Sequence, residues 1–364
     1  MKKVNQLQQA LLSWFAANAR PLPWREQYLS YQVWVSEIML QQTQAERGVV
    51  YFKRWMAHFP DVVSLAAATE DEILKCWEGL GYYSRARNLH AAAKRVVQVH
   101  GGKLPDTLAA LEALPGIGKY TARAILSIAF QQDSPVVDGN VERLFARLFA
   151  IDEPVKKAAG QSRIWGLAEA LLPLGQAREW NQALMECGAL VCVRGTPRCE
   201  LCPVTAECES FSTGTTGARP VVEGGKKIVQ VRLVAAVVVD DSGRVYVRQR
   251  PANVRWANMW EFPDLEITES AQPLKAVVGL FKKGASRSLD GFLPLTTVNH
   301  KYTRYQATVH PFLCRLRGAF SGKLQQEEQP CRWVTLEELN SLAFSSGHRQ
   351  IIDYLPEFLP EQKI

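Results

Sequence analysis

Four of the chain's eight cysteines fall within residues 192–208, where the sequence reads CVRGTPRCELCPVTAEC. Six, two and five residues separate Cys192, Cys199, Cys202 and Cys208. Four thiolates on a short irregular loop after a helix are typical of a metal site. Zinc commonly takes two C-x-x-C-like pairs with a longer segment between them, and only one such pair occurs here. The wide outer spacings favour a cubane iron–sulfur cluster held by the four thiolates, with zinc as the alternative.

A second pattern interrupts two helical stretches at residues 113–122, which read ALPGIGKYTA. Gly116 and Gly118 permit backbone torsions forbidden to other residues and let a partner approach closely. The helix that follows presents free N–H groups and the positive end of its dipole, a natural seat for a phosphate, and Lys119 adds a charge. An ordinary helix–helix connection, the alternative, needs one glycine but not Pro-Gly-x-Gly-Lys. We therefore expect the hairpin 114–122 to bind phosphate.

The spacing of apolar residues, which predicts the helices and strands that position these motifs, changes along the chain. Residues 1–210 show apolar positions at spacings of three and four, which predicts helices throughout. Residues 211–228 are rich in Ser, Thr, Gly and charge and are expected to be a linker. Residues 229–360 contain β-branched runs joined by Asp-Ser-Gly, a hairpin signature, and short helical stretches. We expect two domains, the first helical and the second mixed α and β.

Charge and hydropathy narrow the function classes. The net charge of +7 and the isoelectric point near 9.0 favour a polyanionic partner, although a basic enzyme with a solvated charged face is the alternative. No run of 18 apolar residues offers a membrane span, and the N-terminal stretch lacks a signal-peptide cleavage site. The expectation is a cytoplasmic protein without a membrane partner, in which the clustered cysteines are not a disulfide set.

The hairpin motif followed by the cysteine loop resembles the helix-hairpin-helix DNA glycosylase superfamily, and Asp138 matches that family's aspartate downstream of the hairpin. The stretches WVSEIMLQQTQ at 34–44 and WEGLGYYSRARNL at 77–89 narrow the resemblance to the MutY family of adenine DNA glycosylases. The resemblance implies a mainly α N-terminal glycosylase domain with an iron–sulfur loop and a [4Fe-4S] cluster, and an α/β Nudix-like C-terminal domain. It further implies a monomer that acts on double-stranded DNA carrying adenine opposite 8-oxoguanine or guanine.

Excision of adenine needs one carboxylic acid to protonate the leaving base and one carboxylate to face the developing sugar cation. Glu37 suits the acid, because its neighbours one helical turn away include Val33, Trp34 and Leu40, and burial among them would raise its pKa. The alternative is a partly exposed helix glutamate.

The second carboxylate is Asp138, which precedes Gly139 and a predicted helix. Taken alone it is an N-cap, a common role for aspartate. The resemblance assigns it to the sugar cation, either by charge alone or through a transient covalent bond to the sugar, and makes Asn140 its polar neighbour.

Tyr120 stands where related bifunctional enzymes such as endonuclease III carry a lysine that forms a Schiff base with the sugar. A phenol cannot form an imine, and Lys119 is about 100° away around the helix. Tyr120 therefore predicts a monofunctional glycosylase that leaves an abasic site.

A base inside a duplex must be flipped out before it reaches these groups. The resemblance assigns the filling of the gap to Gln42, Leu80 and Tyr82, with Tyr82 as the stacking wedge, and packing in the core is the alternative for these three. It places Trp24 and Arg25 at the adenine pocket, while the hairpin residues are expected at phosphate. The expected set is Trp24, Arg25, Gln42, Thr43, Leu80, Tyr82, Gly116, Gly118, Lys119 and Thr121. Arg85 and Arg87 read equally well as phosphate contacts or solvated charges.

The second domain lacks the paired carboxylates of the Nudix box, so we expect no metal-dependent hydrolysis by it. The family's Phe-Ser-His loop, which reads 8-oxoguanine, matches Tyr302, Thr303 and Arg304, with arginine in place of histidine. Two other functions remain open: a bifunctional glycosylase–lyase, and a non-catalytic iron–sulfur protein that binds DNA.

Overall fold

The computed structural model describes all of the 364 residues except 1, 223, 225–226, 282–288, 318–328 and 360–364. The chain divides into two compact units, Met1–Ala67 with Asn88–Gly225 and Ala68–Arg87 with Lys226–Ile364. Positions 223, 225 and 226 of the predicted linker, and residue 360 at the end of the predicted second domain, lie outside the described residues. Within the described residues, no helix is both long enough and apolar enough to cross a membrane.

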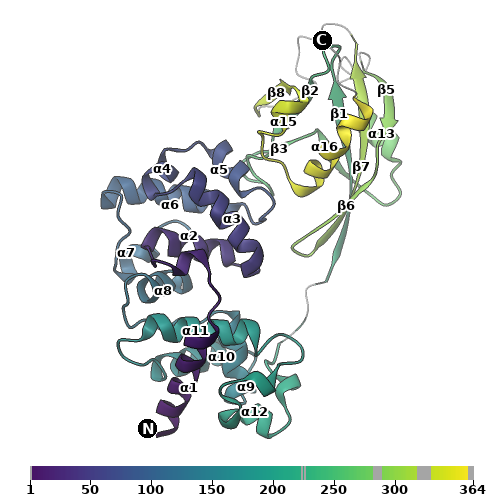
Figure 1. Ribbon diagram of the computed structural model, residues 1–364. Coiled ribbons are helices and arrows are strands. Elements are labelled where there is room, and N and C mark those ends of the chain that lie inside the picture. The colour runs from purple at the N-terminus through teal and green to yellow at the C-terminus, as the bar shows by residue number, and fades with distance from the viewer. Residues whose placement is uncertain (1, 223, 225–226, 282–288, 318–328, 360–364) are drawn as a thin grey trace. The chain divides into compact units, whose positions relative to one another are not determined.

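The first unit is built from helices, as the spacing of its apolar residues predicts (Figure 1). Its α-helices are α1 (Lys2–Asn18), α2 (Ser30–Leu40), α3 (Ala45–His58), α4 (Val62–Ala67), most of α6 (Ser84–His100), α7 (Leu108–Glu112), α8 (Lys119–Ile128), α9 (Gly139–Leu148), α10 (Ala158–Ala170), α11 (Ala177–Leu190) and α12 (Glu209–Ser212). Its described residues also form the 3-10 turns η1 (Pro23–Arg25), η2 (Cys199–Leu201), η3 (Thr205–Glu207) and η4 (Thr216–Ala218).

Helix α11 is the central element of this unit, because it packs against α1, α8 and α9. Trp180 of α11 and Phe145 of α9 are fully buried in the core that these helices share. A smaller apolar cluster joins α2 to α8 through Val33, Ala124 and Ile128. These two clusters fix α2, α8 and the start of α9 beside α11, and so fix the side chains that they carry toward one another.

Residues 211–222, at the start of the predicted linker, are held against the first unit. The Arg147 Nε group donates hydrogen bonds to the carbonyl oxygens of Thr216 and Arg219, both at 3.0 Å. The Val155 N–H donates to Val221 O at 3.3 Å. The chain therefore wraps back over α9 before it reaches the second unit.

The second unit contains a mixed sheet with the order β3-β2-β1-β7-β5, in which β4 also pairs with β1, β6 with β7 and β8 with β2. Long strands β1 (Val229–Val239) and β7 (Tyr305–Leu316) run parallel at its centre. The other strands are β2 (Val245–Gln249), β3 (Trp260–Glu261), β4 (Asp264–Ile267), β5 (Leu289–Pro294), β6 (Val298–Tyr302) and β8 (Cys331–Val334).

Alternating side chains of β1 build a core on each face of this sheet. Ala235 and Val237 point to the face covered by α16 (Ser346–Phe358) and α15 (Leu336–Leu339). Val234 and Val238 point to the opposite face, which α13 (Pro273–Val278) covers (Figure 1). The second domain is thus a sheet between helices, as the mixed pattern of its sequence predicts.

The second unit also includes residues 68–87, which form α5 (Glu70–Trp77), a loop, and the first turn of α6. Thr69 and Glu72 form a capping box at the start of α5, in which each side chain bonds the other residue's backbone N–H. The loop that follows carries Tyr82.

Candidate active site

Glu37 lies on α2 with only 6% of its surface exposed. Burial raises the pKa of its carboxyl group to about 7; a nearby Asp138 acts in the same direction, while a hydrogen bond from Tyr120 and the charge of Arg25 act against it. A carboxyl group with this pKa is partly protonated at neutral pH. The sequence-based expectation of a buried glutamic acid at this position therefore agrees with its surroundings.

Tyr120, in the first turn of α8, donates a hydrogen bond from its hydroxyl group to Glu37 Oε2 at 2.6 Å. Burial and the neighbouring carboxylates raise the pKa of Tyr120 well above its ordinary value, so the phenol stays protonated. Because Tyr120 occupies Oε2, the acidic proton of Glu37 is left to Oε1.

Asp138 is the N-cap residue of α9, where its Oδ1 accepts hydrogen bonds from the N–H groups of Asn140 at 2.9 Å and Val141 at 2.8 Å. The Asn140 side-chain amide donates to Oδ2 at 2.7 Å. Burial raises the pKa of Asp138, and these three bonds oppose that rise. Asp138 is thus the N-cap residue of α9, and its charge is also close enough to raise the pKa of Glu37.

A hydrogen-bond chain extends from Asn140 to the cysteine loop. Arg143 Nη2 donates to Asn140 Oδ1 at 2.9 Å and to Gly188 O at 2.6 Å, while its Nε donates to Cys192 O at 2.6 Å. Gly188 allows this close packing, because a Cβ atom at that position would lie 2.6 Å from Asn140 Cβ. Arg143 therefore couples the position of Asn140 to that of Cys192.

Sequence reasoning missed the environment of Arg25, which centres on Glu186 of α11. Glu186 is 2% exposed; its Oε2 accepts from Arg25 Nη2 at 3.0 Å and its Oε1 from Arg20 Nε at 2.8 Å. Burial alone would raise the pKa of Glu186, but the bonds from Arg20 and Arg25 lower it to about 2. No local signal in the sequence points to this cluster, since Glu186 is more than 160 residues from both arginines.

Other residues expected at the DNA or the base have different degrees of exposure. Trp24 is buried and meets Phe52 edge to face at 5.1 Å. Gln42 is exposed and has a φ of 62°, while Thr43 is half-buried. Thr121 is only 2% exposed, and its hydroxyl accepts from Gln41 Nε2 at 3.3 Å. Their roles on DNA stay predictions.

The hairpin between α7 and α8 has the backbone that its sequence predicts. Gly116 has a φ of 75°, and a Cβ atom there would lie 2.6 Å from Asn88 Cβ, so only glycine fits. Gly118 is the N-cap residue of α8, and among the described residues no side chain caps this helix. The first N–H groups of α8 therefore remain available to an anion.

Lys119 and Arg123, two cations of α8, share one aromatic partner on α10. The Lys119 ammonium lies 4.1 Å and the Arg123 guanidinium carbon 5.2 Å from the ring centroid of Trp165. This arrangement holds both positive charges beside the hairpin. The partner was not foreseen, because Trp165 reads as one more apolar residue of a helix.

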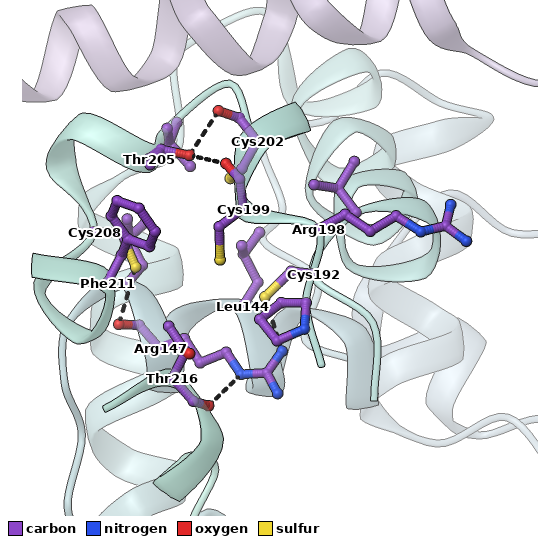
Figure 2. Close-up of a pocket in the computed structure, with 14 residues that line it drawn as sticks. Leu144, Arg147, Cys192, Arg198, Cys199, Cys202, Thr205, Cys208, Phe211 and Thr216 are labelled. Atoms are coloured by element: carbon purple, nitrogen blue, oxygen red, sulfur yellow. Dashed lines mark hydrogen bonds between the residues drawn. The ribbon is translucent and has the colours of Figure 1, made fainter. Parts of the chain in front are cut away.

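The four clustered cysteines line one cavity, and their side chains turn toward its interior (Figure 2). Arg147 Nη1 donates to Cys192 Sγ at 3.4 Å and to Val193 O at 2.8 Å. Thr205 Oγ1 donates to the carbonyl oxygens of Cys199 at 2.5 Å and Cys202 at 3.0 Å. The loop thus holds four thiols around a space walled by apolar side chains, among them Leu144, Val191 and Phe211.

The spacing of these sulfur atoms bears on the choice between zinc and a larger group. In the described part of the chain, only Glu261, Asp264 and His348 bring three ligand atoms within 4.8 Å of one another. The cysteine sulfurs are therefore spread more widely than in a zinc site, where bonds of about 2.3 Å hold four sulfurs around one ion. The donor set and its spread fit a cluster with several metal ions.

Comparison with known proteins matches both units. Residues 35–167 match the HhH-GPD superfamily of base excision DNA repair proteins, and residues 234–354 match the NUDIX domain. The human adenine DNA glycosylase is 32% identical over 96% of this chain and 74% of its own length. An adenine DNA glycosylase of Buchnera aphidicola is 30% identical over 95% of this chain and 97% of its own. This chain belongs to the adenine DNA glycosylase family.

A solved structure supports the fold of the first unit. A thermostable thymine-DNA glycosylase, 28% identical, covers 58% of this chain and 98% of its own, with a TM-score of 0.54. The predicted fold class is confirmed: a helix-hairpin-helix glycosylase domain followed by a Nudix-like domain. The protein is an enzyme, a DNA glycosylase, and the resemblance inferred from its motifs is correct.

The stretch that we expect to supply the wedge lies in the second unit of this chain. Leu80 is buried, whereas 41% of the Tyr82 surface is exposed and its φ is 49°. Tyr83, the next residue, is buried. Of two adjacent tyrosines, only Tyr82 is available to a partner.

The segment matched to the family's lesion loop forms the turn between β6 and β7. Tyr302 and Tyr305 are paired across it, and Thr303 has a φ of 48°. The Arg255 Nη1 group donates to Tyr302 OH at 3.0 Å, and its guanidinium carbon lies 4.2 Å from the Tyr305 ring centroid. Thr303 and Arg304 are exposed at the tip.

The acidic cluster of the second unit is occupied by arginines. Arg248 Nε donates to Glu261 Oε1 at 2.8 Å, and Arg250 pairs with both Glu261 and Asp264. Two guanidinium groups thus neutralise the two carboxylates that would hold a cation. These ion pairs hold Glu261 and Asp264 in place, and nucleotide hydrolysis by the domain stays a separate question.

Proposed function

We propose that this enzyme is a monofunctional adenine DNA glycosylase that removes adenine mispaired with 8-oxoguanine or guanine. The observation that carries the proposal is the buried Glu37 carboxyl group, with a pKa of about 7 and a phenol rather than an amine at 2.6 Å. Membership of the adenine glycosylase family supplies the class of reaction. The residues around Glu37 supply its steps.

Glu37 is the general acid. It transfers a proton to a ring nitrogen of adenine as the glycosidic bond breaks, and the bonding electron pair leaves with the base. The Tyr120 hydroxyl then stabilises the resulting carboxylate through the hydrogen bond that it already donates. Burial thus favours the protonated form of Glu37 before it gives up its proton, and the hydrogen bond from Tyr120 stabilises the carboxylate afterwards.

Asp138 faces the positive charge that develops on the sugar. Its carboxylate is held by three donors, two of them backbone N–H groups, so it does not have to reorient as the cation forms. Water attacks C1′ of the sugar, either directly or after a transient bond to Asp138, and leaves an abasic site. The proton that the water loses returns to the Glu37 carboxylate, which restores the acid. Asn140 orients the carboxylate throughout.

The same geometry disfavours strand cleavage. A lyase needs an amine that forms an imine with the sugar, and the residue bonded to Glu37 is a tyrosine. Lys119, the adjacent amine, lies over Trp165 at 4.1 Å. We therefore expect no lysine to reach C1′.

Duplex DNA is the partner that the remaining residues suit. The uncapped start of α8 and the cations beside Trp165 would bind backbone phosphate. Trp24, Arg25 and Gln42, with Glu186 behind Arg25, would surround the flipped base, and Tyr82 would fill the space it leaves. Tyr302, Thr303 and Arg304 would read the base opposite, which the family's loop meets with histidine rather than arginine.

Cys192, Cys199, Cys202 and Cys208 would hold the [4Fe-4S] cluster. These four thiolates would cross-link the loop 192–208 through the cluster. Arg147 and Arg143 hold the same loop from α9, through Cys192 Sγ and Cys192 O. The loop would therefore be fixed from two sides.

Single-turnover cleavage of duplexes that carry adenine opposite 8-oxoguanine, guanine or cytosine tests the proposal. We expect release from the first two and little from the third, with strand breaks only after alkali treatment. Efficient borohydride trapping of the enzyme on DNA, or equal release from all three duplexes, contradicts it. Release of a different base from other lesion duplexes would overturn it as well.

A further inference from the structure

The loop between α5 and α6 holds an exposed aromatic ring on an unusual backbone. Gly79, Gly81 and Tyr82 all have positive φ values, of 91°, 78° and 49°. Glycine adopts such torsions readily, but a tyrosine does so only when its surroundings impose them. Something in this loop must therefore hold Tyr82 with its ring in solvent.

Neighbouring side chains fix the backbone of this loop. Trp77 Nε1 donates to Gly81 O at 3.0 Å, and the Gly79 N–H donates to Tyr83 OH at 3.1 Å. These bonds anchor both glycines to buried residues, since Trp77 and Tyr83 are both in the core. They leave the direction of the Tyr82 side chain to another group.

That group is the Arg85 guanidinium. Its carbon lies 5.3 Å from the ring centroid of Trp77 and 5.5 Å from that of Tyr82. Its Nη2 donates to Gly81 O at 3.1 Å and to Leu80 O at 3.5 Å. One cation thus joins the buried indole, the exposed phenol and two carbonyl oxygens of the loop between them.

The burial of Arg85 distinguishes it from an arginine that reaches out to phosphate. Burial lowers the pKa of Arg85 to about 10, so it remains a cation at neutral pH while its side chain is largely covered. A guanidinium that already donates to two carbonyl groups and contacts two rings has little freedom to extend toward a DNA backbone. Its contacts with Leu80, Gly81, Trp77 and Tyr82 all lie on the loop that carries Tyr82 or directly before it.

We infer that Arg85 is a positioning residue, which holds Tyr82 in the conformation that enters the space left by the flipped base. This inference rests on the proposed function, because it takes Tyr82 as the wedge. It assigns Arg85 to insertion of the ring rather than to binding of phosphate. Loss of Arg85 should therefore impair base flipping without changing how binding depends on salt.

The test compares Arg85→Met, which keeps much of the length of the side chain, with Arg85→Lys, which keeps the charge. Binding is measured in the Glu37→Gln background on a duplex with 2-aminopurine in place of the target adenine. We expect Arg85→Met to reduce the fluorescence gain on binding to less than half, and Arg85→Lys to reduce it less. With Glu37 restored, the single-turnover rate should fall by about 10- to 100-fold in Arg85→Met, as expected for a misplaced group.

The salt dependence separates the two roles of an arginine. Loss of a phosphate contact lowers the slope of log Kd against log salt by about 0.9. We expect an unchanged slope for Arg85→Met. Arg95→Gln, which removes a charge from an exposed position on α6, is the matched control and should leave the fluorescence gain intact. A slope that falls by about 0.9 with a normal fluorescence gain would overturn the inference.

Two further measurements guard against a general loss of structure. Hydrogen exchange should rise at residues 79–83 in Arg85→Met while the core helices keep their protection; a general rise would overturn the specific role. The double variant Tyr82→Ala/Arg85→Met should be no slower than Tyr82→Ala alone, since both changes remove one device. Additive losses contradict the inference. A normal rate in Tyr82→Ala removes both the wedge and this inference, whereas the role of Glu37 stands or falls separately with Glu37→Gln.

Discussion

Glu37 on α2 and Glu186 on α11 are both buried glutamates of the first unit, with 6% and 2% of their surfaces exposed. Taken alone, burial would raise the pKa of both carboxyl groups. Glu37 has a phenol as its partner and a pKa of about 7, whereas Glu186 has two guanidinium groups and a pKa of about 2. The same residue type at similar depth is thus a proton donor in one place and a permanent anion in the other.

This difference shows that burial alone does not make a catalytic acid. A neutral hydrogen-bond donor such as Tyr120 leaves the cost of desolvating the charge in place, and the carboxyl group keeps its proton. The cations beside Glu186 offset that cost, and the carboxylate then fixes Arg20 and Arg25. The partner of each glutamate therefore decides whether it can do chemistry or hold structure.

The largest effect should come from Glu37→Gln, which keeps the shape of the side chain but removes the proton. Adenine release should fall by about 10²–10⁴-fold or more, with duplex binding retained. Single-turnover release and a binding titration on the same duplex measure the two quantities. Glu112→Gln, at an exposed position of α7, is the control, and undiminished release in Glu37→Gln would remove the proposed mechanism.

Glu186→Gln should act first on stability. The substitution takes the anion from the partly buried Arg25 and leaves Arg20 with the exposed Glu46 alone. We expect the free energy of unfolding to fall by about 3 kcal/mol. Chemical denaturation measures this change, with Glu179→Gln on the exposed side of the same helix as the control. A loss no larger than that of the control would mean that Glu186 does not fix the arginines.

The two glutamates should also give opposite dependences of stability on pH. The raised pKa of Glu37 means that its contribution to stability is present below about pH 4.5 and is lost as pH rises through about 7. The lowered pKa of Glu186 means that its contribution is present above about pH 4.5 and is lost as pH falls toward 2. Glu37→Gln should therefore stabilise the protein by up to about 3 kcal/mol at pH 8 and by little at pH 5. Equal effects at both pH values would contradict the assigned pKa.

Gly188→Ala extends the comparison to the third carboxylate, Asp138. The added Cβ would lie 2.6 Å from Asn140 Cβ, so the start of α9 must shift and Asp138 with it. We expect a loss of about 2 kcal/mol in stability and a slower single-turnover rate. At Gly166 of α10 no described atom lies within 4 Å of an added Cβ, so Gly166→Ala should be neutral or stabilising. Equal behaviour of the two variants would contradict the close packing.

Tyr120→Phe should have the smallest effect and is the most specific test of the phenol. The Tyr120 hydrogen bond lowers the pKa of Glu37, so its loss should raise that pKa above about 7. The alkaline limb of the pH–rate profile should move to higher pH, while the rate at the optimum falls by about 10-fold because the carboxylate product loses its donor. An alkaline limb that stays in place or moves to lower pH would show that the hydrogen bond from Tyr120 does not lower the pKa of Glu37.

Much of this site could be predicted from the sequence because the relevant signals are local. The cysteine loop and the hairpin 114–122 each lie within one short stretch, where spacing alone limits the chemistry. Tyr120 could be interpreted without a structure, since the absence of an amine at that position is a statement about residue type. The domain order followed from the change in apolar period after residue 228.

The rest depended on contacts between distant segments. Glu186 reaches Arg20 across 166 residues, and Trp165 meets Lys119 from another helix; neither pair has a sequence signal. Motifs also do not say which side of an element a residue faces. Thr121 and Leu80, expected at the DNA surface, have side chains that are buried in the free protein.

The uncapped start of α8 has a consequence for the stability of the enzyme itself. Helices usually satisfy their first N–H groups with a capping side chain, but Gly118 offers none to α8. In the free enzyme these groups depend on water, and on DNA a phosphate would take its place. Any anion that binds there stabilises the folded state in proportion to its occupancy. The first turn of α8 should thus be the part of the hairpin that frays most readily on its own and gains most when the enzyme meets its substrate.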